Sequence, residues 1–121
     1  MQISDSEKII MDSLWERSPL TAKQIIESLD SNLNWHDKTV KTLLNRLLKK
    51  KAINFRKNGR EYIYLPILKK SDYVKEAADS FVNRVFNGNV TSLVAAFSKS
   101  EKLTNDDLKA LKKLIQEIED D

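Results

Sequence analysis

Basic and hydroxyl-bearing side chains recur between residues 37 and 51 at spacings that would gather them on one side of a helix. The apolar residues of this stretch follow the i, i+3, i+4, i+7, i+8 pattern of a core-facing stripe. The opposite side carries no acid, whereas an ordinary surface helix mixes glutamate with its lysines. Its side-chain types are those that reach phosphates and base edges in nucleic-acid complexes. The stripe is Val40, Leu43, Leu44, Leu47 and Leu48; the polar side is Lys38, Thr39, Lys41, Thr42, Asn45, Arg46 and Lys49, with Thr39 and Arg46 toward its edge.

A second basic cluster follows in a predicted β-hairpin. The segments 52–56 and 61–66 are rich in Ile, Phe and Tyr and alternate in character. Between them, Asn58-Gly59 predicts a type I′ turn, because that turn needs two residues with positive φ. The tip of the hairpin would then present Lys57 and Arg60 to a polyanion.

Two short helices are predicted ahead of this basic helix. Ser4–Glu7 has the pattern of a capping box and would begin a helix that ends near Arg17. Thr21–Gln24 has the same pattern and would begin the second helix. Three helices followed by a basic hairpin are typical of a winged helix-turn-helix, whose third helix enters the major groove of DNA. We therefore predict a winged-helix DNA-binding domain over residues 1–70.

Residues 71–121 have the periodicity of three further helices. An apolar seam runs from Ser71 to Asn87, and Gly88 is placed to end that helix in the left-handed conformation. A segment of about fifty residues cannot bury several wide apolar faces by itself. We predict that it packs against a second copy; folding back onto the winged domain of the same chain is the alternative. The predicted dimerisation residues are Val74, Ala78, Phe81, Val82, Val85 and Phe86.

The resulting fold class is mainly α with a small β-hairpin wing, followed by a helical dimerisation region. The charge distribution agrees with this division, since residues 1–70 hold 14 Lys/Arg against 8 Asp/Glu and residues 71–121 hold 7 against 10. The excess of positive charge near the basic helix points to a nucleic-acid partner. A winged helix that binds an acidic protein and a nonspecific architectural DNA binder are the alternative functions.

Composition excludes several other classes of protein. The chain has no cysteine, which removes disulfides and thiolate metal sites and fits a cytoplasmic location. No apolar run approaches the roughly 18 residues of a membrane span. Without a nucleophile–base pairing, a glycine-rich phosphate loop or metal-ligand spacing, we expect neither an enzyme nor a cofactor. The single histidine, His36, is expected to cap the basic helix or to contact a phosphate.

Two segments resemble a known family of regulators. NWHDKTVKTLLNRLLKKKAI (34–53) and FVNRVFNGNVTSLVAAF (81–97) are similar to the penicillinase and methicillin-resistance repressors, the BlaI/MecI family, which also includes the copper-responsive CopY repressors. The resemblance covers nearly the whole chain. It implies a bacterial homodimeric transcriptional repressor that occupies a palindromic operator. Carried over by position, the DNA contacts would fall on Lys38, Thr39, Lys41, Thr42 and Arg46, with wing contacts near Lys57 and Arg60.

The chain departs from this family at positions that bear on control. Penicillinase-type repressors are inactivated when a metalloprotease-linked sensor leads to cleavage between an Asn and a Phe. The corresponding bond here is Ala96–Phe97, so the Phe is kept and the Asn is not. Copper-type repressors use C-terminal cysteine motifs, which a cysteine-free chain lacks. The resemblance thus implies a sensor protease as a partner, while the expected bond departs from the pattern.

Overall fold

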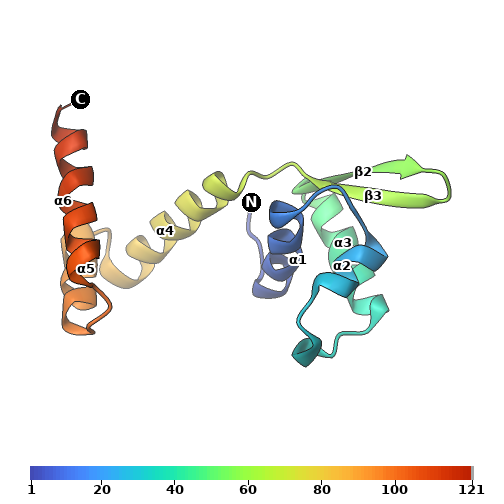
Figure 1. The fold of residues 1–121 in the computed structure, drawn as a ribbon, viewed down its shortest axis with the longest axis horizontal. Coiled ribbons are helices and arrows are strands. Elements are labelled where there is room, and N and C mark those ends of the chain that lie inside the picture. The colour runs from blue at the N-terminus through green and yellow to red at the C-terminus, as the bar shows by residue number, and fades with distance from the viewer. Residues whose placement is uncertain (121) are drawn as a thin grey trace. The chain divides into compact units, whose positions relative to one another are not determined.

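The computed structural model describes residues 1–120 and divides the chain into two compact units, Met1–Val74 and a second that begins at Lys75. The α-helices and the two strands of the hairpin follow one another in the predicted order (Figure 1). The mainly helical fold class with a small hairpin is therefore confirmed. The elements are α1 (Asp5–Glu16), β1 (Leu20–Thr21), α2 (Ala22–Ser28), the 3₁₀ turn η1 (Ser31–Leu33), α3 (Asp37–Lys49), β2 (Ile53–Asn58), β3 (Glu61–Pro66), α4 (Lys70–Phe86), α5 (Val90–Lys99) and α6 (Asn105–Asp120).

Both predicted capping boxes are present. The backbone N–H of Glu7 donates to Ser4 Oγ at 3.1 Å, and the N–H of Ser4 donates to Glu7 Oε1 at 2.9 Å. Thr21 and Gln24 exchange the equivalent pair of hydrogen bonds at the start of α2. Each box satisfies two backbone donors that the first turn of a helix leaves without partners, which fixes where α1 and α2 begin.

The core of the first unit is built around α3. Val40, Leu43, Leu44 and Leu47 are at most 4% exposed, and Leu48 is half-buried beside them. These side chains pack with apolar residues of α1, α2 and the sheet; the other members of the core are Ile10, Met11, Leu14, Leu20, Ile25, Ala52, Ile53 and Tyr64. Because the leucine stripe is locked into this core, the opposite face of α3 must point to solvent.

The sheet has three strands in the order β1-β3-β2, one more than the sequence predicted. Leu20 pairs with Tyr64 and Thr21 with Ile63, both antiparallel. The sequence predicts only a helix end near Arg17 here, because two residues are too few to show the alternation of a strand. This short strand attaches β3 to the segment between α1 and α2, so the base of the hairpin is held by the helical core.

The turn of the hairpin differs from the prediction. Asn58 pairs with Glu61, so the two turn residues are Gly59 and Arg60. Of these only Gly59 has a positive φ, +69°, and Asn58 does not have one. The predicted type I′ turn is therefore wrong: one positive φ at the first turn position is the pattern of a type II′ turn. Arg60 accordingly lies in the turn itself.

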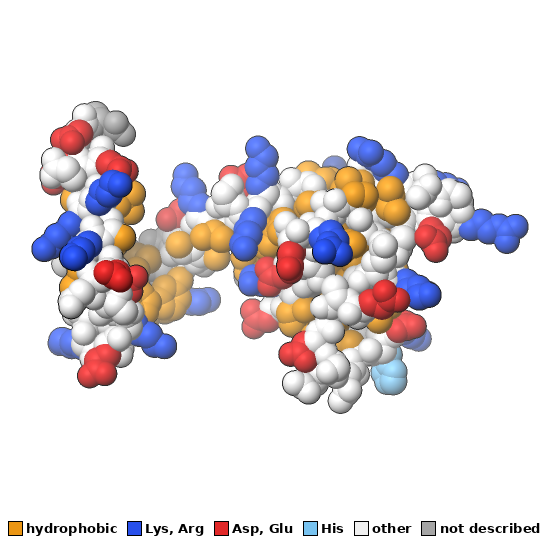
Figure 2. Space-filling model, viewed as in Figure 1, with side chains coloured by type: hydrophobic (Ala, Val, Ile, Leu, Met, Phe, Trp, Pro, Cys, Tyr) orange, Lys and Arg blue, Asp and Glu red, His pale blue; other side chains and the backbone are white. Residues whose placement is uncertain are grey.

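The second unit leaves its apolar side chains uncovered. In a single copy, no residue of α4, α5 or α6 is buried among those that the structure describes. Hydrophobic side chains are visible at the surface over α4 (Figure 2). α4 is followed by two left-handed residues, Asn87 at φ +52° and Gly88, predicted to have this conformation, at φ +82°. No helix within residues 1–120 is long and apolar enough to cross a membrane.

A buried ion pair ties α1 to the end of α3. Glu7 is 1% exposed, and its Oε1 accepts from Lys50 Nζ at 2.5 Å, while Lys50 also donates to the carbonyl of Gln2 at 2.8 Å. Burial alone would raise the pKa of Glu7, but the hydrogen bonds from Lys50 and Ser4 outweigh it and the pKa lies below its ordinary value of 4.5. Since the folded pKa is the lower one, this carboxylate stabilises the fold above about pH 4.5 and loses that contribution as the pH falls.

Replacing Glu7 by Gln should lower the free energy of unfolding by about 1–3 kcal/mol at neutral pH, because it breaks the ion pair between Glu7 and Lys50. In this pair the Glu7 side chain is buried and the Lys50 side chain is partly exposed to water. Urea unfolding at several pH values measures this. The difference from the unsubstituted chain should shrink as the pH falls through the lowered pKa of Glu7. Lys8→Ala is the control, because it removes an exposed pair with Asp12 and should cost less than about 1 kcal/mol. A difference that stays constant down to pH 2 would contradict the role of this ion pair.

Candidate nucleic-acid interface

The polar side of α3 forms one continuous exposed face. We call it the α3 polar face and define it by Lys38, Thr39, Lys41, Thr42, Asn45, Arg46 and Lys49, all of which are exposed. The structure thus brings together every residue that the sequence analysis placed on this side of the helix. Leu43, by contrast, is 4% exposed and belongs to the core.

The cations of the α3 polar face are free of acidic partners. Within residues 1–120, none of its four basic side chains forms an ion pair with a carboxylate. The single acid of α3 is Asp37, in the first turn, where the positive end of the helix dipole favours a negative charge. An unpaired cation keeps its charge available to a phosphate, so the face has the electrostatic character of a polyanion-binding surface.

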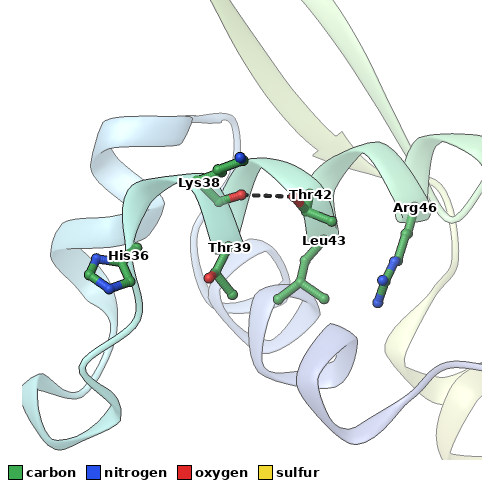
Figure 3. Close-up of a pocket in the computed structure, with 6 residues that line it drawn as sticks. All are labelled: His36, Lys38, Thr39, Thr42, Leu43 and Arg46. Carbon is green, nitrogen blue, oxygen red and sulfur yellow. Dashed lines mark hydrogen bonds between the residues drawn. The ribbon is translucent and has the colours of Figure 1, made fainter.

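Thr42 has a hydroxyl group that is already engaged within the helix. Its Oγ1 donates to the backbone carbonyl of Lys38 at 2.9 Å, as the dashed line in Figure 3 shows. A hydroxyl has one proton to donate, so the oxygen of Thr42 is left as an acceptor. Beside it lies a shallow hollow lined by His36, Lys38, Thr39, Thr42, Leu43 and Arg46 (Figure 3).

His36 occupies the N-cap position of α3 without capping it. Its backbone is extended, with φ −72° and ψ 153°, but its side chain makes no capping hydrogen bond. The predicted capping role is therefore wrong, which agrees with the preference of N-caps for the short side chains of Ser, Thr, Asp and Asn. The imidazole is exposed and lies at the rim of the hollow next to Lys38 and Thr39.

The two tryptophans support the first unit rather than forming an open stacking platform. Trp15 is half-buried, and its Nε1 donates to the carbonyl of Leu68 at 2.8 Å. Its ring also lies 5.4 Å from that of Tyr73, centroid to centroid. Trp35 is half-buried against the core immediately before α3. Both side chains therefore help to hold the elements that orient α3.

The hairpin carries three exposed basic residues, Arg56, Lys57 and Arg60, and an aromatic pair. Lys57 and Arg60 are exposed, Lys57 near the end of β2 and Arg60 in the turn. Phe55 and Tyr62 pack on each other with ring centroids 4.8 Å apart, although they are 41% and 46% exposed. The Lys57 ammonium lies 5.9 Å from the centre of the Tyr62 ring. The sequence does not reveal this exposed pair. The alternation of residue types shows that a strand has two faces, but it does not show which residues of a face are covered by the core.

The residues predicted for dimerisation and for proteolytic control all lie on helices. On α4, Val74, Ala78, Phe81 and Val85 are exposed, and Val82 and Phe86 are half-buried. The Phe81 and Phe86 rings are in edge contact, with centroids 5.8 Å apart.

The predicted cleavage bond lies on α5. Ala96 and Phe97 are both exposed and have helical backbone within Val90–Lys99. A protease binds an extended strand, so this bond could be cut only after local unfolding of α5.

The chain is similar over most of its length to known repressors. A family model described as penicillinase repressor matches residues 3–117. A penicillinase repressor of Bacillus licheniformis is 35% identical over 116 residues, which cover 96% of this chain and 91% of the relative. The methicillin resistance regulatory protein MecI of Staphylococcus aureus is 31% identical over 114 residues, covering 94% of this chain and 93% of the relative.

Solved structures with the same fold include DNA-binding domains. The solution structure of the DNA-binding domain of the repressor BlaI is 40% identical with a TM-score of 0.54, and the match covers 60% of this chain and 88% of that one. A solution structure of the monomeric form of Bacillus licheniformis BlaI in complex with the blaP half-operator is also 40% identical, with a TM-score of 0.53, covering 60% and 89%. The predicted winged-helix fold is thereby confirmed.

Proposed function

The chain belongs to the penicillinase repressor family, and from that premise we propose that two copies of it repress transcription from a palindromic operator, each reading one half-site with α3. It is a DNA-binding transcriptional repressor, in keeping with its family and fold, and is not an enzyme. The main support for recognition of DNA by α3 is the α3 polar face, which is exposed, rich in cations and free of acidic residues.

In this proposal α3 enters the major groove and the hairpin contacts the backbone. Residues near the start of α3, such as Lys38 and Thr42, meet base edges, as the N-terminal part of a recognition helix does. Lys41 and Arg46, toward the two edges of the face, bind phosphates, and so do Lys57 and Arg60 of the wing. Two α3 helices of a dimer would meet major grooves about 10 bp, or a small multiple of that, apart.

We further propose that the helices from α4 onward join the two subunits. Their exposed apolar side chains support this, since a single soluble copy rarely exposes so many. The predicted contacts are Val74, Ala78, Phe81, Val82, Val85 and Phe86 of α4. The alternative is a monomer in which this region folds back onto the winged domain, and measurement of the oligomeric state distinguishes the two.

A sensor protease remains a predicted partner. Its target would be the Ala96–Phe97 bond, where Ala stands in place of the Asn expected in penicillinase-type repressors. Because this bond lies inside α5, cleavage would depend on how readily α5 opens.

Alanine substitutions on α3 test which of its residues contact phosphates and which contact bases. Lys41→Ala should weaken binding to operator and random duplex alike, because a phosphate contact carries no sequence information. Lys38→Ala and Thr42→Ala should instead reduce the preference for operator over random duplex, by about 5- to 100-fold for a lost base contact. Fluorescence anisotropy with both duplexes measures each effect, with Lys8→Ala of α1 as the control. Equal losses on both duplexes from all three substitutions would mean that α3 does not read bases, as in a nonspecific architectural binder.

A further inference from the structure

We propose that the hollow beside α3 receives the C5 methyl group of a thymine, so that Thr42 selects an A·T pair in each half-site. This inference rests on the proposed function, in which the α3 polar face reads the operator. It assigns the thymine methyl group as the ligand of the hollow and Thr42 as the residue that selects the base pair.

Thr42 is placed to meet a base edge. It lies near the middle of the α3 polar face, with Lys38 one turn before it and Arg46 one turn after it. It is exposed and uncharged. A DNA phosphate would be attracted to the two cations. The base edge opposite Thr42 instead meets the hydroxyl oxygen and the methyl group of the Thr42 side chain.

The hydrogen bond within α3 determines what that oxygen can recognise. Because the Thr42 proton is used by the Lys38 carbonyl, Oγ1 can only accept. The guanine edge in the major groove presents two acceptors, N7 and O6, which would face the lone pairs of Oγ1 without a proton between them. Adenine N6 and cytosine N4 are donors that Oγ1 can accept from. Guanine is therefore disfavoured as the base that Thr42 contacts.

The hollow distinguishes between the two remaining base pairs. It is bordered by the Thr42 and Thr39 side chains and by Leu43, a core residue of which only 4% is exposed (Figure 3). The methyl groups of the two threonines and the Leu43 side chain make this part of the hollow apolar, while His36, Lys38 and Arg46 line the rest of it. Among the bases, thymine alone presents an apolar group in the major groove, its C5 methyl. A thymine methyl in the hollow buries apolar surface of both the base and the protein. Cytosine has no methyl group at this position and buries less apolar surface.

Removing single methyl groups from DNA and from the protein tests this inference. The probe is a duplex selected by the full-length chain from a random pool, with each thymine replaced in turn by deoxyuridine, which lacks only the C5 methyl. One thymine in each half-site should lower the affinity by about 4-fold when replaced, the value expected for one buried methyl group. Replacing both should lower it by about 15-fold if the half-sites are independent.

Two variants at position 42 locate the effect. Thr42→Ser keeps the hydroxyl and removes the methyl, so it should bind more weakly and no longer distinguish that thymine from uracil. Thr42→Val keeps the shape and the methyl without the hydroxyl, so it should still distinguish them. Thr91→Ser, at an exposed position of α5, is the matched control and should behave as the unsubstituted chain.

The possible outcomes separate this inference from the function on which it rests. If the chain prefers its selected duplex but no uracil replacement changes the affinity, the inference is wrong and the proposed function stands. The same holds if Thr42→Ser remains as sensitive to the replacement as the unsubstituted chain. If no selected duplex is preferred over random DNA, the proposed function fails and the inference fails with it.

Discussion

Replacing Phe81 or Val85 of α4 by glutamate should convert the proposed dimer into monomers. Both side chains are large and apolar, and in a single copy they are 39% and 51% exposed. Covering them in an interface removes apolar surface from water, whereas a glutamate at the same place would have to be buried without a partner. The cost of about 3–5 kcal/mol corresponds to about two to four orders of magnitude in the dissociation constant of the dimer.

Analytical ultracentrifugation at micromolar concentration measures this change. The variants should sediment near the 14.0 kDa of one chain rather than at twice that mass. Ser80→Glu is the matched control, because it adds the same charge to α4 away from the apolar seam and should leave the dimer intact. If Phe81→Glu and Val85→Glu both remain dimeric, α4 does not provide the interface.

The loss of the dimer should also weaken operator binding. A second subunit that is already tethered binds its half-site at a high effective concentration, which commonly raises affinity by 10²- to 10⁴-fold. The Phe81→Glu variant should lose about that much affinity for a full palindrome and little for a single half-site. Anisotropy titrations with the two duplexes therefore show whether dimerisation and DNA reading are separate properties of the two units.

The elements that several residues indicate together could be predicted from the sequence. Five apolar residues at helical spacing determine which side of α3 is buried, and the capping boxes at Ser4 and Thr21 determine where α1 and α2 begin. Each of these signals combines several residues that favour the same conformation, which makes it robust. The same signals place the α3 polar face at the surface.

The features that escaped prediction depend on contacts between distant residues. β1 is formed by only two residues, and Leu20 has a strand partner because Tyr64 lies beside it in the fold. The register of the hairpin shifts the turn by one residue, so that Gly59 alone needs a positive φ. The hydrogen bond of Thr42 to the Lys38 carbonyl is also invisible in the sequence, since a helical threonine has two rotamers of comparable energy.

Salt should weaken DNA binding by this protein steeply. Each lysine or arginine that neutralises a phosphate releases condensed counterions, and this release becomes less favourable as the salt concentration rises. If each subunit contacts three or four phosphates through cations such as Lys41, Arg46, Lys57 and Arg60, the affinity of the dimer should fall by about 10³- to 10⁴-fold between 50 and 200 mM salt. Lys41→Ala should make the slope of log K against log salt shallower by about two, one phosphate for each subunit, while Lys8→Ala should leave it unchanged.

The proposed mode of binding requires the acid-free, cation-rich face of α3 to meet the phosphates and base edges of a DNA duplex. A titration of the full-length chain with fluorescent duplex at a series of salt concentrations tests it most directly. If the α3 polar face binds in this way, the slope of log K against log salt is about −5 to −7 and becomes shallower in the Lys41→Ala variant. A slope near zero, or a steep slope that Lys41→Ala leaves unchanged, would contradict it.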